Sequence, residues 1–174
     1  MDTERLYLIA DQPGFTPEIS RLISMMNYAR YTTLHAVREL SIEQLDERPA
    51  GFGNSIAMLL EHFAGVEVVY QIITFEGREP NEDELSRWTP GLDLGKKGES
   101  IRGKPLERYL EQLAEVRAKT LAEFAKRDDA WLHQEFPWWD EKPGNNYFCW
   151  FHVFEDEINH RGQIRLIRKN LTSS

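Results

Sequence analysis

The amino-acid sequence predicts an all-α fold, a four-helix bundle with one long crossover between its second and third helices. Three observations support this prediction. Four stretches place apolar side chains at helical spacing, no stretch alternates apolar and polar residues as a strand does, and residues 77–104 lack strong periodicity. We expect one domain over residues 1–174, because a chain of this length can bury a core of its own.

The first helix is expected over residues 17–40. Thr16 offers an N-cap, Pro17 suits the first helical position, and Glu18 places a negative charge in the first turn. His35 lies opposite the apolar stripe, so it is expected in solvent. The stripe consists of Ile19, Leu22, Ile23, Met26, Thr33, Leu34, Val37 and Leu40.

A short helix over residues 41–47, opened by a capping-box pattern, precedes the second long helix. The second helix is expected from Asn54 or Ser55 to about Glu76. His62 lies on the flank of its apolar stripe, either as a boundary residue with satisfied hydrogen bonds or along a seam between helices. The stripe consists of Ile56, Leu59, Leu60, Phe63, Val66, Tyr70 and Ile73.

The segment 77–104 is rich in glycine, proline and charge, with Trp88 as its one aromatic residue. An irregular segment of this length indicates a crossover, a functional loop, or both. The third helix, expected over residues 105–127, has the most regular pattern in the chain. Its stripe consists of Leu106, Tyr109, Leu110, Leu113, Val116, Leu121 and Phe124.

The loop that follows is dense in aromatic residues. Two interpretations of this loop stay open: it covers one end of the bundle and lines a pocket, or it plugs the core. The fourth helix begins with Asn145 or Asn146 as its cap and continues to about Asn170. The aromatic residues of the loop are Trp131, Phe136, Trp138, Trp139 and Tyr147.

The composition narrows the classes of function. A net charge of −8 argues against a nucleic-acid partner. Cys149 is the single cysteine, which excludes an internal disulfide, fits a reducing cytosol and predicts a buried structural thiol. No apolar run approaches the ~20 residues of a membrane span, and the N-terminus lacks the features of a signal peptide. We therefore expect a cytoplasmic protein with no membrane partner.

The fourth helix places His152, Asp156 and His160 at every fourth position, on one stripe. A metal ion would satisfy these polar groups, and so would solvent or buried hydrogen bonds. Asp156 and His160 can bind one ion together, but a third ligand must come from another helix. Among the remaining histidines, His62 is the best placed. A di-iron carboxylate bundle is excluded, because it needs two Glu-x-x-His motifs and the chain has one, at residues 157–160.

Two runs of sequence resemble the metal-bearing helices of the DinB-like (DinB/YfiT) superfamily of four-helix-bundle metalloenzymes. They are LEHFAGVE at residues 60–67 and HVFEDEINHRGQ at residues 152–163. The resemblance covers most of the chain and implies that His62, Asp156 and His160 hold one divalent metal ion. Most members have histidine where this chain has Asp156, and the branch similar to mycothiol-dependent isomerases has a carboxylate there. A set of two histidines and one carboxylate suits Zn²⁺, our first expectation, and also Ni²⁺, Mn²⁺ or Fe²⁺.

The resemblance also implies an activity on a small-molecule substrate. Members of the superfamily that this chain resembles are similar to S-transferases and isomerases that use a low-molecular-weight thiol such as bacillithiol or mycothiol. A metal-dependent hydrolase would use the same site. His152 is expected to orient a bound water or substrate, and Gln163 to donate a hydrogen bond to a ligating residue, whereas Arg161 ties helices together. The alternative is a non-catalytic, stress-related binding or scaffold protein with a structural or vestigial metal. The resemblance implies a homodimer in both cases.

Overall fold

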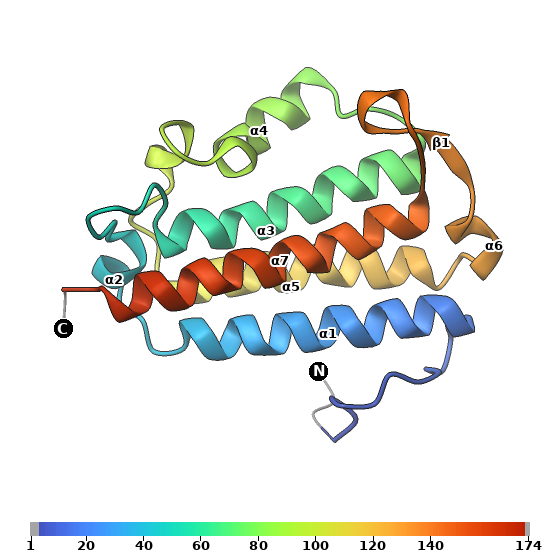
Figure 1. The fold of residues 1–174 in the computed structure, drawn as a ribbon, viewed down its shortest axis with the longest axis horizontal. Helices are drawn as coiled ribbons and strands as arrows, with labels where there is room; N and C mark the ends of the chain where they lie inside the picture. The colour runs from blue at the N-terminus through green and yellow to red at the C-terminus, as the bar shows by residue number, and fades with distance from the viewer. Residues whose placement is uncertain (1–3, 173–174) are drawn as a thin grey trace.

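The computed structural model describes residues 4–172 and confirms the all-α bundle (Figure 1). Helices α1 and α7 run in one direction and α3 and α5 in the other. Neighbouring helices pack in the order α1, α7, α3 and α5. The four long helices are α1 (Pro17–Val37), α3 (Ile56–Gln71, continued by the π-helix η1, Ile72–Glu76), α5 (Leu106–Phe124) and α7 (Asn146–Lys169).

Side-chain caps explain where several helices begin. The predicted capping box is present at Ser41, which opens the short helix α2 (Ile42–Asp46). Ser55 caps α3 and Asn145 caps α7. The predicted cap at Thr16 is wrong in its details, because the Thr16 side chain does not accept from the helix. Its hydroxyl donates to Asp129, and the same Asp129 oxygen accepts from the backbone amides of residues 18 and 19.

The crossover contains a helix that the sequence pattern does not predict. Helix α4 (Glu82–Asp93) opens on a capping box at Asn81, and the 3₁₀-helix η2 (Lys97–Ser100) follows it. Because α3 and α5 are parallel, the chain must return along the bundle between them, and α4 forms most of this return (Figure 1). The helix is mostly polar and has Pro90 within it, so its apolar pattern is short and interrupted.

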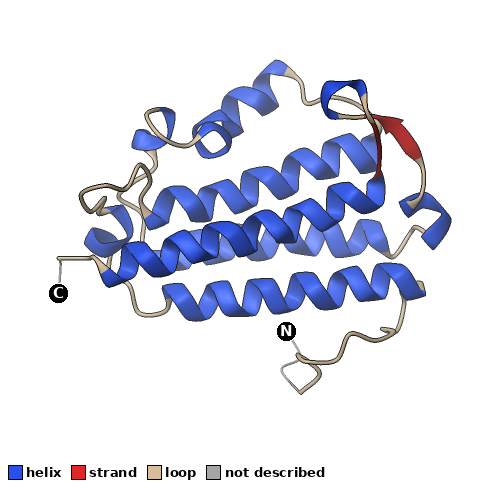
Figure 2. Ribbon diagram, viewed as in Figure 1, coloured by secondary structure: helices blue, strands red, loops and turns tan. Residues whose placement is uncertain are grey.

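The segment before α7 also contains structure that the sequence does not predict. After the short helix α6 (Asp129–Leu132), strands β1 (Glu135–Pro137) and β2 (Pro143–Asn145) pair antiparallel, with η3 (Trp139–Glu141) between them (Figure 2). The sequence shows no alternating strand pattern, and the two strands found here leave the all-α fold class unchanged. Strands of three residues are too short to show an alternating pattern.

The bundle core consists of two apolar clusters with a polar layer between them. One cluster takes residues 36–37 of α1, 56–64 of α3 and 164–167 of α7. The other takes residues 19–29 of α1 and 149–154 of α7, with Cys149 fully buried as predicted. In each long helix the positions between the two clusters include one buried charged side chain. These four are Arg30, Glu67, Arg117 and Glu157.

The four charged side chains form one network of two arginines and two glutamates. Nε of Arg30 is 2.9 Å from Oε1 of Glu157, and Nη2 of Arg30 is 3.4 Å from Oε2 of Glu67. Nε of Arg117 donates to Oε1 of Glu67 at 2.7 Å, and Thr120 donates to the same oxygen at 2.6 Å. The opposite charges balance, which is the condition under which buried ions are tolerated. The network therefore links all four helices at one level of the bundle.

Two further expectations about single residues are confirmed. His35 is exposed on α1. Arg161 of α7 ties helices together, because its guanidinium donates to the hydroxyl of Thr32 on α1.

The segment Ile56–Glu76, α3 with η1, is long and apolar enough to cross a membrane by length and composition alone. This finding differs from the sequence analysis, which expects no apolar run close to the length of a membrane span. Within the bundle, 83% of its apolar window is buried, as is typical of a core helix.

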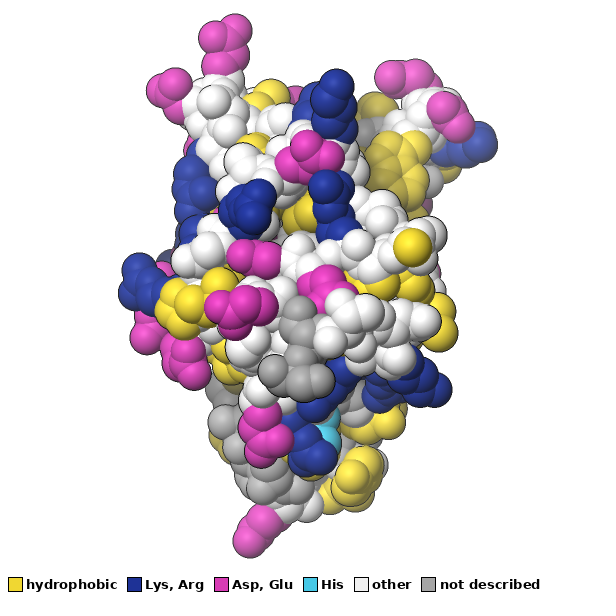
Figure 3. All heavy atoms as spheres, turned by 90° about the vertical axis from the view of Figure 1, so that its left-hand side faces the viewer, with side chains coloured by type: hydrophobic (Ala, Val, Ile, Leu, Met, Phe, Trp, Pro, Cys, Tyr) yellow, Lys and Arg dark blue, Asp and Glu magenta, His cyan; other side chains and the backbone are white. Residues whose placement is uncertain are grey.

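The end of the bundle that carries α2 and the C-terminus has acidic and basic side chains interspersed on its surface (Figure 3).

Candidate metal centre

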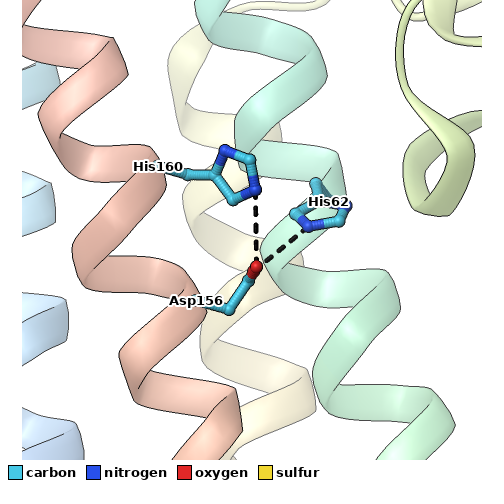
Figure 4. A group of neighbouring side chains, drawn as sticks. All are labelled: His62, Asp156 and His160. Carbon is cyan, nitrogen blue, oxygen red and sulfur yellow. Dashed lines mark ion pairs between the residues drawn. The ribbon is translucent and has the colours of Figure 1, made fainter. Parts of the chain in front are cut away.

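Three side chains able to bind a metal lie together at the seam between α3 and α7. His62 comes from α3, and Asp156 and His160 come from successive turns of α7. The two helices pack directly against each other, so side chains that face their common seam meet. The structure thus brings together the three residues that the family resemblance implies as ligands, from segments far apart in the sequence (Figure 4).

The carboxylate of Asp156 lies within reach of both imidazoles. Its Oδ2 is 3.1 Å from Nε2 of His62, and its Oδ1 is 3.4 Å from Nε2 of His160. The two rings lie edge to face with centroids 4.7 Å apart. The candidate ligand atoms all fall within 4.8 Å of one another. In a tetrahedral site with bonds of ~2.1 Å the ligands lie about 3.4 Å apart, so small side-chain movements would let one ion bind all three.

The Asp156 carboxylate is ionised and only partly satisfied. Its side chain is 16% exposed, and its Oδ2 has no hydrogen bond of normal geometry among residues 4–172, although His62 is close. Burial alone would raise the pKa of Asp156, but its contacts with His160 and His62 lower it far below its usual range. A buried anionic oxygen with unused lone pairs, beside two imidazole nitrogens, is a donor set that fits a divalent cation.

A hydrogen bond to the backbone of α4 orients the ring of His62. Its Nδ1 lies 2.9 Å from the backbone carbonyl oxygen of Gly91 in α4. A carbonyl oxygen only accepts, so Nδ1 carries the proton and donates this hydrogen bond. This hydrogen bond leaves Nε2, the nitrogen that faces Asp156, as the atom that can bind a metal ion. Metal-binding histidines are commonly oriented in this way.

His160 completes the cluster from the next turn of α7. The Asp156 carboxylate raises the pKa of His160 against the opposing effect of burial, and the nearby amide of Gln163 adds to the increase. Gln163 is exposed, and Nδ1 of His160 has no hydrogen bond of normal geometry within the described chain. Gln163 therefore lies next to a candidate ligand as expected, and its role as a donor stays a prediction.

His152 is outside the three-residue cluster. Its Nδ1 lies 3.0 Å from Oε2 of Glu155, and the side chain of Asn159 donates to the other oxygen of that carboxylate. Its ring stacks on Phe148 at 6.0 Å and meets the ring of Trp139 edge to face at 5.2 Å. His152 thus joins the turn that carries Asp156 to the aromatic loop.

The aromatic loop both packs on the core and lines a cavity. Trp131 and Phe136 pack against the buried cluster at this end of the bundle. Trp139 and Phe148, the two rings that contact His152, line a cavity of about 460 Å³. Each of the two interpretations of the loop is therefore correct for a part of it. Other residues that line the cavity include Glu135, Trp138, Asp140, Lys142 and Gly144.

Comparison with known proteins identifies the family. The family model of the mycothiol S-transferases matches residues 21–173. The chain belongs to this family. The family is DinB/YfiT-like, which confirms the resemblance seen in residues 60–67 and 152–163. No curated protein is significantly similar to the chain.

A solved structure supports the same fold. A crystal structure described as a conserved protein of locus from Enterococcus faecalis superposes with a TM-score of 0.66. The two chains are 17% identical, and the match covers 85% of this chain and 93% of the other. At this identity the likeness concerns the fold alone.

Sequence reasoning missed two neighbours of the site. Glu155 lies three positions after His152, a helical spacing that pairs side chains, so its contact with His152 was accessible from the sequence. Gly91 lies in the crossover that was expected to be irregular. A contact made by its backbone carbonyl leaves no signal in the sequence.

Proposed function

We propose that this protein is a metal-dependent S-transferase that joins a low-molecular-weight thiol of the mycothiol or bacillithiol type to a small electrophile. The observation that supports this proposal most strongly is the convergence of His62, Asp156 and His160 in a member of the mycothiol S-transferase family. The side chain of Asp156 is shorter than that of a glutamate would be, yet its carboxylate contacts both histidines. We propose Zn²⁺ as the ion.

The three side chains would bind the ion and leave coordination positions open for a substrate atom. A divalent ion supplies a Lewis acid that lowers the pKa of a bound thiol toward neutrality. The low exposure of the three side chains, between 10% and 18%, limits access of water to the ligand atoms and strengthens their electrostatic interactions.

His152 is proposed to transfer the proton of the thiol. The Glu155 carboxylate accepts from Nδ1 of His152, which leaves Nε2 free to act as a base. In the transfer the S–H bond breaks and Nε2 takes the proton. The sulfur then forms a bond to carbon as the bond from carbon to the leaving group breaks. The leaving group departs with that bond's electron pair, and His152 returns its proton to the leaving group or to water.

The cavity lined by Trp139 and Phe148 is proposed to receive the electrophile. Aromatic walls favour an apolar or aromatic acceptor. The rings of Trp139 and Phe148 both contact His152, so an acceptor held there would lie near the proposed base.

Zinc-loaded protein is expected to conjugate mycothiol or bacillithiol to monochlorobimane faster than it conjugates glutathione or cysteine. Replacing His152 with alanine should lower kcat by about 10²–10⁴-fold without loss of bound zinc, because proton transfer is lost and the ligand cluster remains. The rate of fluorescent conjugate formation and the zinc content of the same samples are the measurements.

Three outcomes would contradict parts of this proposal. Activity of His152→Ala equal to that of the unmodified protein would exclude the proposed base. Absence of conjugation with all four thiols, together with zinc-dependent thermal stabilisation, would favour the non-catalytic alternative with a structural metal. Hydrolysis of ester or amide substrates by the zinc-loaded protein, without need of a thiol, would favour the hydrolase.

We also propose that the protein is a cytoplasmic homodimer. Phe151 and Ile158 of α7 and Tyr28 of α1 are 37–43% exposed, on two helices that pack side by side. Apolar side chains exposed on adjacent helices are typical of an interface with another chain. Sedimentation equilibrium would show a mass near twice that of the chain, and a single-chain mass would contradict the dimer.

A further inference from the structure

The crossover helix α4 contacts the candidate metal centre through its backbone. Gly91 is buried in the last turn of α4, where carbonyl groups lack a partner within the helix. The amide of Gly95, four residues further on, donates to Asn54 instead, at 2.9 Å. The chain leaves the helix at Leu94, which has a φ of 55°. The Gly91 carbonyl is thus free to accept the hydrogen bond from Nδ1 of His62.

Glycine at position 91 lets α4 approach α3 closely. A Cβ atom on this residue would lie 3.2 Å from the backbone carbon, the backbone oxygen and the Cγ of Glu61. Contacts with backbone atoms are relieved only when one helix moves away from the other. Glu61 directly precedes His62, so such a movement would separate the Gly91 carbonyl from the His62 ring at the place where they meet.

Two ion pairs hold the crossover against the same turn of α3. The buried Glu61 carboxylate lies 3.5 Å from Nη1 of Arg87 in α4 and 3.6 Å from Nζ of Lys104, which follows η2. The Glu61 side chain is 5% exposed, whereas Arg87 and Lys104 are about half exposed. The contact with Arg87 holds α4, and the contact with Lys104 holds the end of the crossover, against the turn of α3 that carries His62.

We propose that Gly91 is a positioning residue of the metal centre. Its carbonyl accepts a hydrogen bond from Nδ1 of His62 and so orients the ring, and its lack of a side chain brings that carbonyl within hydrogen-bond distance. The inference rests on the proposed metal centre and adds a residue that does not itself bind the ion. Loss of a hydrogen bond of this kind usually lowers metal affinity by about 10–100-fold.

The test compares Gly91→Ala with Gly65→Ala, two substitutions at the contact between α3 and α4. A Cβ on Gly65 would meet the side chains of Trp88 and Leu92 at 3.3 and 3.4 Å, so its packing change is similar but does not involve the Gly91 carbonyl. We expect Gly91→Ala to weaken Zn²⁺ binding about tenfold in a chelator competition, and Gly65→Ala to leave it unchanged. Alanine has the higher helix propensity, so unfolding of α4 would not explain the loss.

A second measurement needs neither the metal nor the activity. Proton-detected nitrogen-15 NMR of the metal-free protein should show a proton on Nδ1 of His62 that exchanges slowly with solvent, and Gly91→Ala should make this exchange faster. Equal zinc affinity in Gly91→Ala and the unmodified protein would overturn the proposal, and so would an equal loss in Gly65→Ala. An Nδ1 of His62 that carries no proton in the unmodified protein would also overturn it. If the unmodified protein binds no zinc, the metal centre fails, while the exchange of the Nδ1 proton still tests the role of Gly91.

Discussion

Replacing His62 or Asp156 with alanine is expected to reduce bound zinc from about one ion per chain to near zero. Each variant leaves two protein ligands where a stable zinc site needs at least three. His62 supplies the ligand from α3, and the carboxylate of Asp156 is the group that contacts both histidines. Elemental analysis of untagged protein, purified without chelators and dialysed in parallel, measures the change.

His35→Ala and His152→Ala are the matched controls for these two variants. His35 is exposed on α1, and His152 lies on α7 outside the cluster, so both should retain zinc as the unmodified protein does. Zinc content that is unchanged in His62→Ala and Asp156→Ala would exclude the site. Equal loss of zinc in His35→Ala would point to binding elsewhere on the surface.

Disruption of the buried network is expected to cause the largest loss of stability. Glu67→Gln removes the negative charge that Arg30 and Arg117 share, and leaves buried positive charge without full compensation. Removal of one partner from a buried ion pair typically costs about 3–5 kcal/mol in the free energy of unfolding. Urea denaturation at pH 7 measures this change. Arg108→Ala, which breaks the exposed pair with Glu111, should change the same free energy by less than about 1 kcal/mol.

The same network predicts how stability depends on pH. Burial alone would raise the pKa of Glu67, but Arg117 and Arg30 lower it below its ordinary value of 4.5. A carboxyl group with a lowered pKa in the folded state adds stability that is present above the unfolded-state value. That stability is lost as the pH falls through the folded-state value. The difference in unfolding free energy between the unmodified protein and Glu67→Gln should therefore narrow only below about pH 4.5. A difference that is constant from pH 7 to pH 3 would contradict this assignment.

The four long helices could be predicted because each has an apolar stripe long enough to show its period. Helix α4 could not, because Pro90 interrupts a pattern that consists mainly of Leu85, Trp88 and Leu92. Its place in the fold depends on packing against α3 and on the ion pairs of Glu61, which exist only after the bundle has formed. Tertiary contacts therefore stabilise the helical conformation of a segment whose own sequence favours a helix only weakly.

The candidate site could be predicted in part. The spacing of Asp156 and His160 within one helix indicates a pair of ligands, because the geometry of a helix is known in advance. The choice of His62 as the third ligand needed the resemblance to the family, since spacing does not reveal which helices become neighbours. The network of Arg30 and Glu67 was missed for the same reason. In the sequence each of these charges resembles an ordinary surface residue, and opposite charges meet only in the folded bundle.

A crystal structure of the zinc-loaded protein, with anomalous data collected at the zinc edge, tests the metal centre most directly. We predict one anomalous peak per chain between α3 and α7. The ion should lie within ~2.0–2.2 Å of Nε2 of His62, a carboxylate oxygen of Asp156 and Nε2 of His160. A peak at other residues, or an ion that lacks either Asp156 or His62 as a ligand, would contradict it.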